Sequence, residues 1–405
     1  MRVLLVTMGS RGDVEPFAAL AAGLARTGHD PLLAAPRRLT EHAAARGVPV
    51  APLDDGIFAL QAEVAGKGTR ASVTAARSAL PLLRRWLDDV ATLQDSDADV
   101  VVYAPKSLGA HHLADRLGVP SIAALPVPLF SPTARFASPL SPVRLPRFLN
   151  RASWRLAGAV EAPYRRMVRT WRSEALGLTG PTSGLVNRVA RDGILHAWSP
   201  HLLPAPDDWP AELAPIGFWS GASHDRWTPP DALARFLDAG EPPVYVGFGS
   251  MLAKDPDAFT RTVLDGLHRS GRRAVLATGW GALRPSDVPE TVHVLDQAPH
   301  DWLLPRTSVA VHHGGVGTVA AALRAGVPQV IKPFLGDQPF WARRVQEIGI
   351  GAAPLAGRLT ADRLATALDD AASAAGAARE TAARVREEDG VGVAVARIER
   401  RVDGA

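Results

Sequence analysis

The stretch HHGGVGTVAAALRAGVPQVIKPFLGDQPFWARRV, residues 312–345, decides the fold expected for this chain. The apolar run Ser308–His313, which leads into it, is typical of a buried strand. A turn of glycines follows, and Thr318 begins a helix that leads to a second strand, Val327–Lys332. A strand, a helix and a further strand in this order predict a parallel α/β sheet.

The glycine turn of this stretch is suited to bind a phosphate group. Backbone N–H groups and the positive end of the helix dipole point outward from a helix start, and glycine lets a ligand approach them closely. His313 and Thr318 add side-chain donors. The second strand ends in a loop with Asp337 and Gln338, a carboxylate beside an amide, which suits adjacent hydroxyl groups of a hexose. The stretch therefore predicts a nucleotide-sugar site.

Length and composition favour an enzyme of two domains. The chain has 405 residues, more than a single core usually supports, and 47% of them are hydrophobic. Cysteine is absent, which excludes disulfides and thiolate metal sites and predicts a cytoplasmic protein. No apolar run is long enough to span a membrane, and the opening MRVLLVTMGSRGD is interpreted as a strand rather than a signal peptide. The formal net charge of +4 comes without a nucleic-acid-binding motif, so nucleic acid is not expected as a partner.

Strand-like and helix-like segments alternate in both halves of the chain. They predict an N-terminal domain at 1–215, a linker at 216–242 and a second domain at 243–385, with a last helix at 386–405 for which packing back on the first domain is one option. The expected strands, in chain order, are Val3–Thr7, Pro31–Ala35, Val48–Leu53, Asp99–Tyr103, Val119–Leu125, Pro243–Met251, Arg273–Thr278, Thr291–Asp296, Ser308–His313 and Val327–Lys332.

The turn TMGSRGDVEP, Thr7–Pro16, carries polar residues at the end of the first strand. Asp13 is interpreted either as the N-cap of the first helix, worth about 1 kcal/mol, or as a carboxylate that contacts a ligand at the carboxyl end of the sheet. Gly9 and Gly12 do not form the G-x-G-x-x-G fingerprint of dinucleotide-binding proteins, which disfavours a nicotinamide or flavin enzyme.

Two further segments of the second half carry candidate binding residues. Ser250, in VGFGSM, follows the strand that opens this half and is interpreted as a phosphate donor or as an ordinary turn serine. Gln297 and Ala298, in DQAPHDWLLP, offer backbone groups that can pair with a nucleobase edge. Trp302 in the same segment is expected to pack into the core.

The order and separation of these segments carry a family resemblance. The pieces GSRGDVEP, FGSM, APHDWLLP, HHGGVGT and GDQPFWARRV resemble the nucleotide-sugar-dependent glycosyltransferases of the GT-B fold, and among these the chain looks most like the bacterial natural-product and sterol branch. The resemblance is strong over residues 243–350 and weaker over the opening segment. It implies two Rossmann-like parallel-sheet domains that face each other across a cleft.

The resemblance assigns roles to the candidate residues. It implies that the donor diphosphate is bound by Ser250, His313, Gly315, Gly317 and Thr318. Asp337 and Gln338 would then bind the sugar, and Gln297 and Ala298 the nucleobase. A UDP- or dTDP-hexose is expected as co-substrate, with no further cofactor and no metal ion.

The resemblance also implies a general base. Asp13 stands where the related plant enzymes have a histidine, so an inverting transfer is expected in which Asp13 accepts the proton of the acceptor hydroxyl as the new C1–O bond forms. Ser10, Arg11 and His112 would position the acceptor or the phosphate. His111 and His112 are the second choice of base.

Two departures from the plant pattern bear on the nucleotide. Gln297 stands where those enzymes stack the uracil on a tryptophan, and Ala321 stands where a glutamate binds both ribose hydroxyls. UDP-sugars and dTDP-sugars are both compatible with the sequence as donors. The sugar of dTDP has no 2′-hydroxyl, so dTDP loses no contact when the ribose-binding glutamate is absent.

The acceptor is expected to be a hydrophobic small molecule. Residues 135–172 combine apolar side chains with many arginines and a single acid, Glu161, which indicates either a solvated helix face or a surface for peripheral contact with an anionic membrane. A nucleotide-sugar epimerase of the same fold and a non-catalytic sugar-nucleotide-binding partner protein are the alternative functions. A monomer and a homodimer are both compatible with the sequence.

Overall fold

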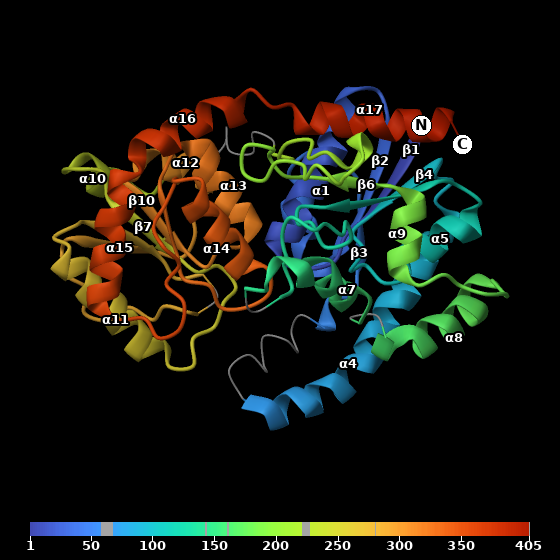
Figure 1. Ribbon diagram of the computed structural model, residues 1–405, viewed down its shortest axis with the longest axis horizontal. Helices are drawn as coiled ribbons and strands as arrows, with labels where there is room; N and C mark the ends of the chain where they lie inside the picture. The colour runs from blue at the N-terminus through green and yellow to red at the C-terminus, as the bar shows by residue number, and fades with distance from the viewer. Residues whose placement is uncertain (58–67, 142–143, 160–161, 221–226, 280, 405) are drawn as a thin grey trace. The chain divides into compact units, whose positions relative to one another are not determined.

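The computed structural model describes residues 1–57, 68–141, 144–159, 162–220, 227–279 and 281–404. It divides into two units, Met1–Gly221 with Asp389–Ala405, and Ala222–Glu388. Each unit contains one parallel sheet with helices around it (Figure 1). The α/β class and the two parallel sheets expected from the sequence are therefore confirmed. Among the described residues, no helix combines the length and the apolar character needed to cross a bilayer.

The first unit is built on a sheet whose described strands have the order β3-β2-β1-β4-β5-β6. The strands are β1 Arg2–Val6, β2 Asp30–Pro36, β3 Val50–Leu53, β4 Val100–Tyr103, β5 Ser121–Leu125 and β6 Ile194–His196. The helices are α1 Arg11–Arg26, α2 Thr40–Ala44, α4 Gly68–Ala91, α5 Ala110–Leu117, α6 Asn150–Ser153, α7 Arg155–Ala159, α8 Arg165–Leu176, α9 Leu185–Asp192 and α17 Gly390–Asp403. Short 3₁₀ turns lie at Arg37–Leu39, Thr92–Asp95, Arg147–Leu149, Ala162–Tyr164 and Ala211–Leu213.

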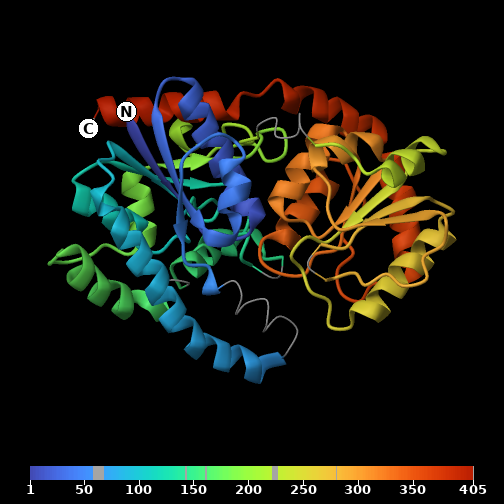
Figure 2. The ribbon, with the colours of Figure 1, turned by 180° about the vertical axis from the view of Figure 1, so that it is seen from behind.

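Helices cover both faces of this sheet, which is why its strands are almost wholly apolar. Helices α1 and α17 pack on one face, and α4, α5, α8 and α9 pack on the other (Figure 1, Figure 2). Helix α17 comes from the end of the chain and lies against α1. A Cβ atom on Gly23 of α1 would lie 2.2 Å from Cγ1 of Val391, so glycine allows this close approach. The last helix therefore belongs to the first unit.

The second unit is built on a sheet whose described strands have the order β11-β10-β7-β8-β9. The strands are β7 Val244–Gly247, β8 Ala274–Ala277, β9 Val292–Leu295, β10 Val309–His312 and β11 Gln329–Ile331. The helices are α10 Asp231–Asp238, α11 Pro256–Arg269, α12 His300–Leu303, α13 Val316–Ala325, α14 Gln338–Glu347, α15 Ala361–Ser373 and α16 Ala375–Arg386, with a 3₁₀ turn at Leu304–Arg306.

Two sequence-based expectations differ from the structure. The sequence analysis does not predict β6, because an edge strand of three residues is too short to show a periodic pattern. The expected linker 216–242 is wrong in its second half, because α10 forms there and buries Leu233 in the core of the second unit. Pro230 precedes this helix, a place where proline does not disturb helical hydrogen bonding, whereas the sequence analysis took the prolines as breakers.

We expect Ile398→Ala in α17 to destabilise the first unit by about 2–5 kcal/mol, because Ile398 is fully buried against α1 and its truncation leaves a cavity. Hydrogen exchange of α1 peptides, followed by mass spectrometry, measures this local loss of protection. Val393→Ala on the same helix is the matched control, because Val393 is 41% exposed. Equal protection of α1 in both variants would contradict the assignment of α17 to this core.

Candidate active site

The strand order of the first sheet reverses between β1 and β4. The chain runs from β1 outward to β3 and then returns to β4, which lies on the other side of β1, before it continues to β6. Open α/β sheets bind ligands outside the carboxyl ends of the strands at such a reversal. The turn that holds Gly9 follows β1, and Lys106 follows β4, so both lie at this point.

Asp13 lies in the first turn of α1, directly after the β1 turn. Ser10 is the N-cap of α1, and Asp13 is the third residue of the helix, so the expectation of Asp13 as N-cap is wrong by three positions. Asp13 Oδ2 accepts hydrogen bonds from the backbone N of Ser10 at 2.7 Å and from its Oγ at 3.1 Å. The carboxylate thus completes one half of a capping box and stays 27% exposed.

Lys106 forms an ion pair with the other oxygen of Asp13, Oδ1, and the sequence analysis missed this contact. Gly9 makes room for the pair, because a Cβ atom there would lie 2.0 Å from Asp13 Oδ2 and 2.6 Å from Lys106 Nζ. A signal was present in the sequence, since Lys106 is one of only four lysines and follows directly on the Asp99–Tyr103 strand.

The other expected positioning residues of the first unit do not gather around Asp13. Arg11 is exposed on α1. His111 and His112 are buried on α5 with their ring centroids 4.0 Å apart, and Nδ1 of His112 lies 3.5 Å from an oxygen of Asp115. Burial lowers the pKa of His111 well below its usual value, so its ring is neutral at neutral pH.

A cavity of about 890 Å³, here called the large cavity, lies within the first unit. Its lining includes the buried side chains of Trp154, Val168 and Leu185, together with His112. Four exposed arginines also line it, namely Arg151, Arg155, Arg165 and Arg169. Its volume is that of a typical small-molecule site, and its apolar wall suits a hydrophobic ligand.

In the second sheet the strand order reverses between β7 and β10, and His313 lies at this point. Its ring fits between two glycine turns. A Cβ atom on Gly249, after β7, would lie 3.2 Å from His313 Cε1, and one on Gly315, after β10, would lie 2.5 Å from His313 Nε2. Larger residues at Gly315 would displace the ring. The glycines that were expected to leave room for a phosphate therefore also leave room for the His313 ring.

The neighbouring His312 holds the turn in place. Its ring is fully buried, with Nε2 3.0 Å from Oε1 of Gln329, while its Nδ1 accepts a hydrogen bond from the backbone N of Gly314 at 3.1 Å. Gly314 has a φ of +90°, and a Cβ atom there would lie 2.6 Å from Ile331. The first histidine of the HHGG sequence is therefore structural, and the second faces the candidate site.

His313 is a neutral hydrogen-bonding group. Burial lowers its pKa from 6.5 to about 4, so the ring is uncharged at neutral pH. Nδ1 is buried and has no hydrogen-bond partner among the described residues. A neutral imidazole carries one N–H, so His313 can donate to an anionic oxygen but does not act as a cation.

Helix α13 begins beside this ring. Gly315 is its N-cap and the helix starts at Val316, two residues before the expected start at Thr318. Gly317 and Thr318 lie in its first turn, where the backbone N of Thr318 donates to the oxygen of Gly315 at 2.9 Å and the N–H groups that precede it have no partner within the helix. Ser250 is partly exposed in the turn after β7, the strand that pairs with β10. The first turn of α13 therefore provides donors for a phosphate at the reversal point.

Asp337 and Gln338 follow β11, the strand beside β10, and differ in how their side chains are engaged. Asp337 is partly exposed, and its Oδ2 accepts a hydrogen bond from the indole N–H of Trp341 at 2.8 Å. Gln338 is buried, and its Oε1 accepts from the backbone N of Phe334 at 2.7 Å and of Leu335 at 3.1 Å. The Gln338 amide oxygen therefore stabilises the loop at Phe334 and Leu335. The sequence analysis did not predict this role.

Gln297 and Ala298 follow β9, on the far side of the sheet from β11. Gln297 is exposed, and Ala298 packs partly into the core beside it. Trp302 is only half-buried, against Trp227 and under the guanidinium of Arg306. Among the described residues, no group of three or more His, Asp or Glu side chains is arranged to hold a metal ion.

Two family models match this chain. Residues 3–133 match the glycosyltransferase family 28 N-terminal domain, and residues 275–394 match the erythromycin biosynthesis protein CIII-like C-terminal domain. The first match contains the reversal point of the first sheet, and the second contains β10 and His313 but not β7 and Gly249.

The chain is also similar to curated sterol 3-beta-glucosyltransferases. That of Arabidopsis thaliana is 33% identical over 98% of this chain, and that of Emericella nidulans is 32% identical over 100% of it. The chain spans 64% of the plant relative and 30% of the fungal one. Of the bacterial natural-product and sterol branch expected from the sequence, these plant and fungal relatives support the sterol part and not a bacterial origin.

Solved structures show the same fold. The calicheamicin glycosyltransferase CalG4 matches with a TM-score of 0.71 and 20% identity, over 99% of this chain and 98% of that one. The glycosyltransferase VinC in complex with dTDP matches with a TM-score of 0.65 and 19% identity over 100% of both chains. The GT-B fold expected from the sequence is therefore confirmed.

We expect the stability of the second unit to fall as the pH is lowered from 6.5 to 4, because unfolded His313 takes up a proton in this window and folded His313 does not. In His313→Gln this part of the pH dependence should be lost. Thermal unfolding of the full chain at a series of pH values measures it. His268→Gln, at an exposed histidine of α11, is the control. Equal pH dependence in the wild type and His313→Gln would show that the folded ring takes up the proton.

Proposed function

Because the chain belongs to the GT-B glycosyltransferases, we propose that it transfers a sugar from a nucleotide sugar to a hydroxyl group of a hydrophobic acceptor. The observation that carries this proposal is the position of His313, held between Gly249 and Gly315 where the strand order of the second sheet reverses. Ligands of open α/β sheets bind at this point. The nucleotide sugar is the co-substrate, and no metal ion takes part.

The donor lies along the carboxyl edge of the second sheet. The strand order supports this arrangement, because the candidate sugar residue Asp337 follows β11, His313 follows β10, and Gln297 follows β9 at the opposite end. Five strands in a row extend over about 19 Å. An extended nucleotide sugar can therefore place its hexose near Asp337, its diphosphate at His313 and its base near Gln297. UDP- and dTDP-sugars are both accepted, because Ala321 provides no carboxylate for the ribose hydroxyls.

The leaving diphosphate is stabilised by hydrogen bonds. As the C1–O bond breaks, negative charge develops on the phosphate oxygen. The N–H of neutral His313, the hydroxyl of Thr318 and the backbone N–H groups at the start of α13 donate to it. Ser250 donates from the neighbouring turn after β7.

Asp13 is the general base. A carboxylate has about four acceptor positions, and in this structure Ser10 occupies two on Oδ2 while Lys106 occupies one on Oδ1. The remaining position on Oδ1 takes the proton of the acceptor hydroxyl. Because such a hydroxyl is far too weak an acid to ionise beforehand, the proton moves as the hydroxyl oxygen attacks C1. A single displacement of this kind inverts the configuration at C1.

The acceptor binds in the large cavity of the first unit. The apolar wall of Trp154, Val168 and Leu185 supports a hydrophobic molecule with a fused-ring or chain body. The sterol acceptors named for the plant and fungal relatives support a 3-hydroxysterol or a molecule of similar shape.

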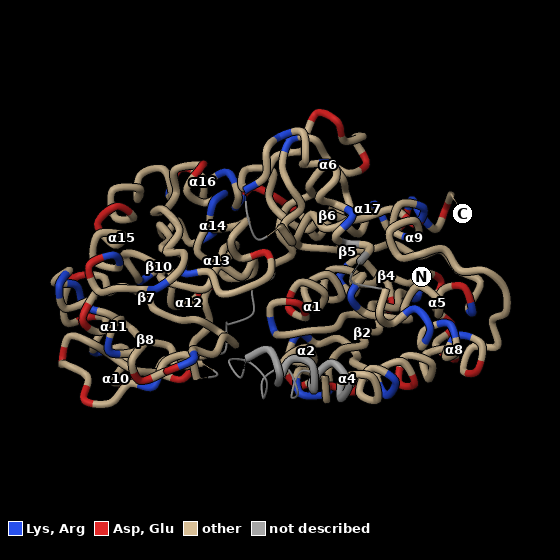
Figure 3. The backbone as a smooth tube through the Cα atoms, turned by 60° about the horizontal axis from the view of Figure 1, so that its bottom comes forward, with Lys and Arg blue, Asp and Glu red and all other residues tan. Residues whose placement is uncertain are grey.

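The protein collects this acceptor from an anionic membrane. Phe148 is 81% exposed and Leu149 38%, although most large apolar side chains of this unit are buried. Exposed Arg144 and Arg147 flank them. Figure 3 shows Lys and Arg positions, in blue, beside α6, the helix that follows Leu149 in the chain. Apolar side chains with arginines beside them are suited to the surface of a bilayer with anionic lipids. Arg135 and Arg151 contribute less, because Asp207 and Asp208 lie against them.

We expect Asp13→Asn to lower turnover roughly 10²–10⁴-fold and to leave nucleotide-sugar affinity unchanged, because the donor residues lie in the second unit. The amide oxygen can still accept from Ser10, so the helix start is preserved. Transfer from UDP- and dTDP-glucose to a sterol, and calorimetry with the donor alone, measure the two quantities.

Ser10→Ala is the matched control for Asp13→Asn. It removes the hydroxyl at the helix start and costs about 1 kcal/mol of stability, but it keeps the carboxylate, so turnover should fall far less. Wild-type turnover in Asp13→Asn would remove Asp13 from the mechanism. A product with retained anomeric configuration would exclude the single displacement.

We expect the full chain to sediment with vesicles that contain phosphatidylglycerol and not with vesicles of phosphatidylcholine alone. Phe148→Ser should weaken binding roughly tenfold or more, because one large apolar side chain no longer enters the bilayer. Leu335→Ser is the control, since Leu335 is 61% exposed but lies in the second unit. Equal binding of Phe148→Ser and Leu335→Ser to the vesicles would show that the Phe148 region is not the membrane-binding surface.

A further inference from the structure

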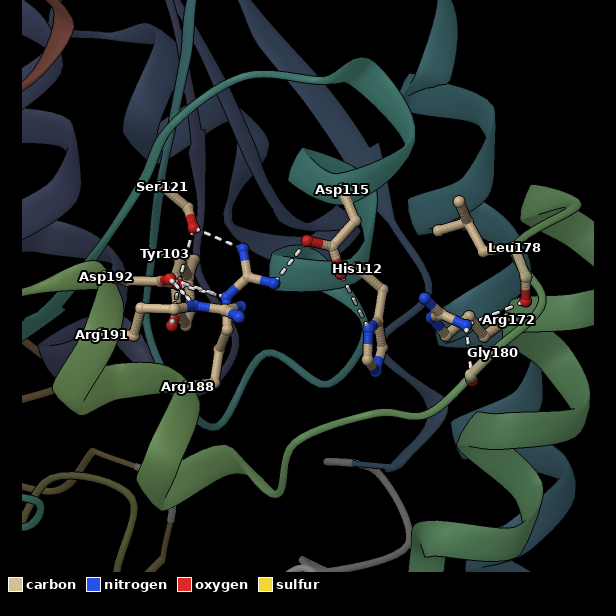
Figure 4. Close-up of polar contacts among 10 residues, drawn as sticks. All are labelled: Tyr103, His112, Asp115, Ser121, Arg172, Leu178, Gly180, Arg188, Arg191 and Asp192. Atoms are coloured by element: carbon tan, nitrogen blue, oxygen red, sulfur yellow. Dashed lines mark hydrogen bonds and ion pairs between the residues drawn. The ribbon is translucent and has the colours of Figure 1, made fainter. Parts of the chain in front are cut away.

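A second cavity of about 200 Å³ lies in the first unit, and we call it the small cavity. It is next to the large cavity, with which it shares His112, Pro181 and Thr182. Its charged and polar lining comes from α5, α8 and α9, namely His111, His112, Asp115, Arg172, Arg188 and Arg191. Figure 4 shows these helices bringing His112 between the guanidinium groups of Arg188 and Arg172.

Two buried polar atoms of this lining have no hydrogen-bond partner among the described residues, Nε2 of His111 and Nε of Arg172. Nδ1 of His112 has only a long contact, 3.5 Å, with an oxygen of Asp115. The side chains of His111, His112 and Arg172 are only 5%, 5% and 9% exposed. Leaving a buried polar group unpaired costs about 1–3 kcal/mol, so two such groups on one small cavity indicate a ligand that accepts hydrogen bonds.

The two acids beside the cavity are already neutralised. Arg188 Nε donates to both oxygens of Asp192 at 2.7 and 2.6 Å, and its Nη1 donates to Asp115. Arg191 lies 3.7 Å from Asp192. Although burial opposes it, the contacts with His112 and Arg188 hold the pKa of Asp115 below its usual range, so Asp115 stays a charged partner of Arg188.

Arg172 has no acid as a partner. Its Nη1 donates to the backbone oxygens of Leu178 at 2.9 Å and Gly180 at 3.5 Å, and within the described part of the chain no carboxylate pairs with it. A buried guanidinium that contacts only neutral groups is costly. The small cavity therefore has a net positive charge without a resident counterion.

We propose that the small cavity binds a compact oxyanion, a carboxylate or a phosphate or sulfate monoester, that belongs to the acceptor. This inference rests on the proposed function. The shared residues place the anionic group of the acceptor beside its apolar body in the large cavity. Arg172 and the two histidines donate hydrogen bonds to the oxyanion, and the preferred acceptor is thus an anionic amphiphile with a sterol-like apolar body.

The test compares two probes that differ only in charge. Lithocholate has a hydroxyl group, an apolar ring body and a carboxylate, and its methyl ester lacks the charge. By calorimetry, the full chain should bind lithocholate roughly tenfold to a hundredfold tighter than the ester, the ratio expected for one or two hydrogen bonds to a charged group. Arg172→Gln and His112→Phe should bring this ratio close to one, with circular dichroism as a check of the fold.

Arg116→Gln is the matched control, because Arg116 is an exposed arginine of α5 that lines neither cavity. It should keep the wild-type ratio. Equal affinity for the two probes in the wild type, or an unchanged ratio in both Arg172→Gln and His112→Phe, would overturn the proposal. If inorganic phosphate binds with the same dependence on Arg172 while lithocholate shows no preference over its ester, the site holds a free anion and the acceptor assignment is wrong.

The same probes separate this inference from the proposed function. Sugar transfer to the methyl ester with no preference for lithocholate would keep the function and reject the anion site. Preferential binding of lithocholate without transfer to either probe would keep the anion site and reject the function.

Discussion

The reversal of strand order in each sheet is the constraint on which both candidate half-sites depend. In a parallel sheet, connections that leave neighbouring strands in opposite directions carry their helices to opposite faces, and the turns after those two strands remain uncovered. In the first sheet the Gly9 turn and Lys106 occupy this position, and in the second sheet Gly249 and His313 occupy it. The candidate binding and catalytic residues therefore lie at the two turns that the connecting helices leave uncovered.

The two reversal points differ in electrostatic character. The first carries an ion pair between Asp13 and Lys106, and both side chains keep contact with solvent. The second carries a neutral ring, because the glycines pack closely around His313 and partial burial lowers its pKa to about 4. A neutral donor suits a dianionic phosphate that must arrive and later leave, since a buried cation there would be costly when the site is empty. Arg172, at the small cavity, is by contrast a buried cation with no carboxylate among its described partners.

Sequence analysis found most of the residues at these points because their signals are local. Glycines after an apolar run predict a turn, and the residues around His313 follow from that turn alone. The same local reasoning placed Asp13 three positions from its actual place in the helix, and started α13 two residues late, because helix boundaries depend on capping geometry that a single pattern does not fix. It assigned Gln338 to the sugar, and it did not predict that the Gln338 amide oxygen accepts hydrogen bonds from the loop that precedes it.

The sequence by itself determined the two parallel sheets, and it marked the glycine turn as a candidate nucleotide-sugar site and Asp13 and His313 as candidate residues, because each of these rests on residues close together in the chain. Only the tertiary structure decided that Lys106 meets Asp13, that Gly249 and His313 touch, and that Arg172 has no carboxylate among its described partners. These relations join segments far apart in sequence. They depend on which strands become neighbours and which helices cover them, and hydrophobic periodicity does not encode either choice.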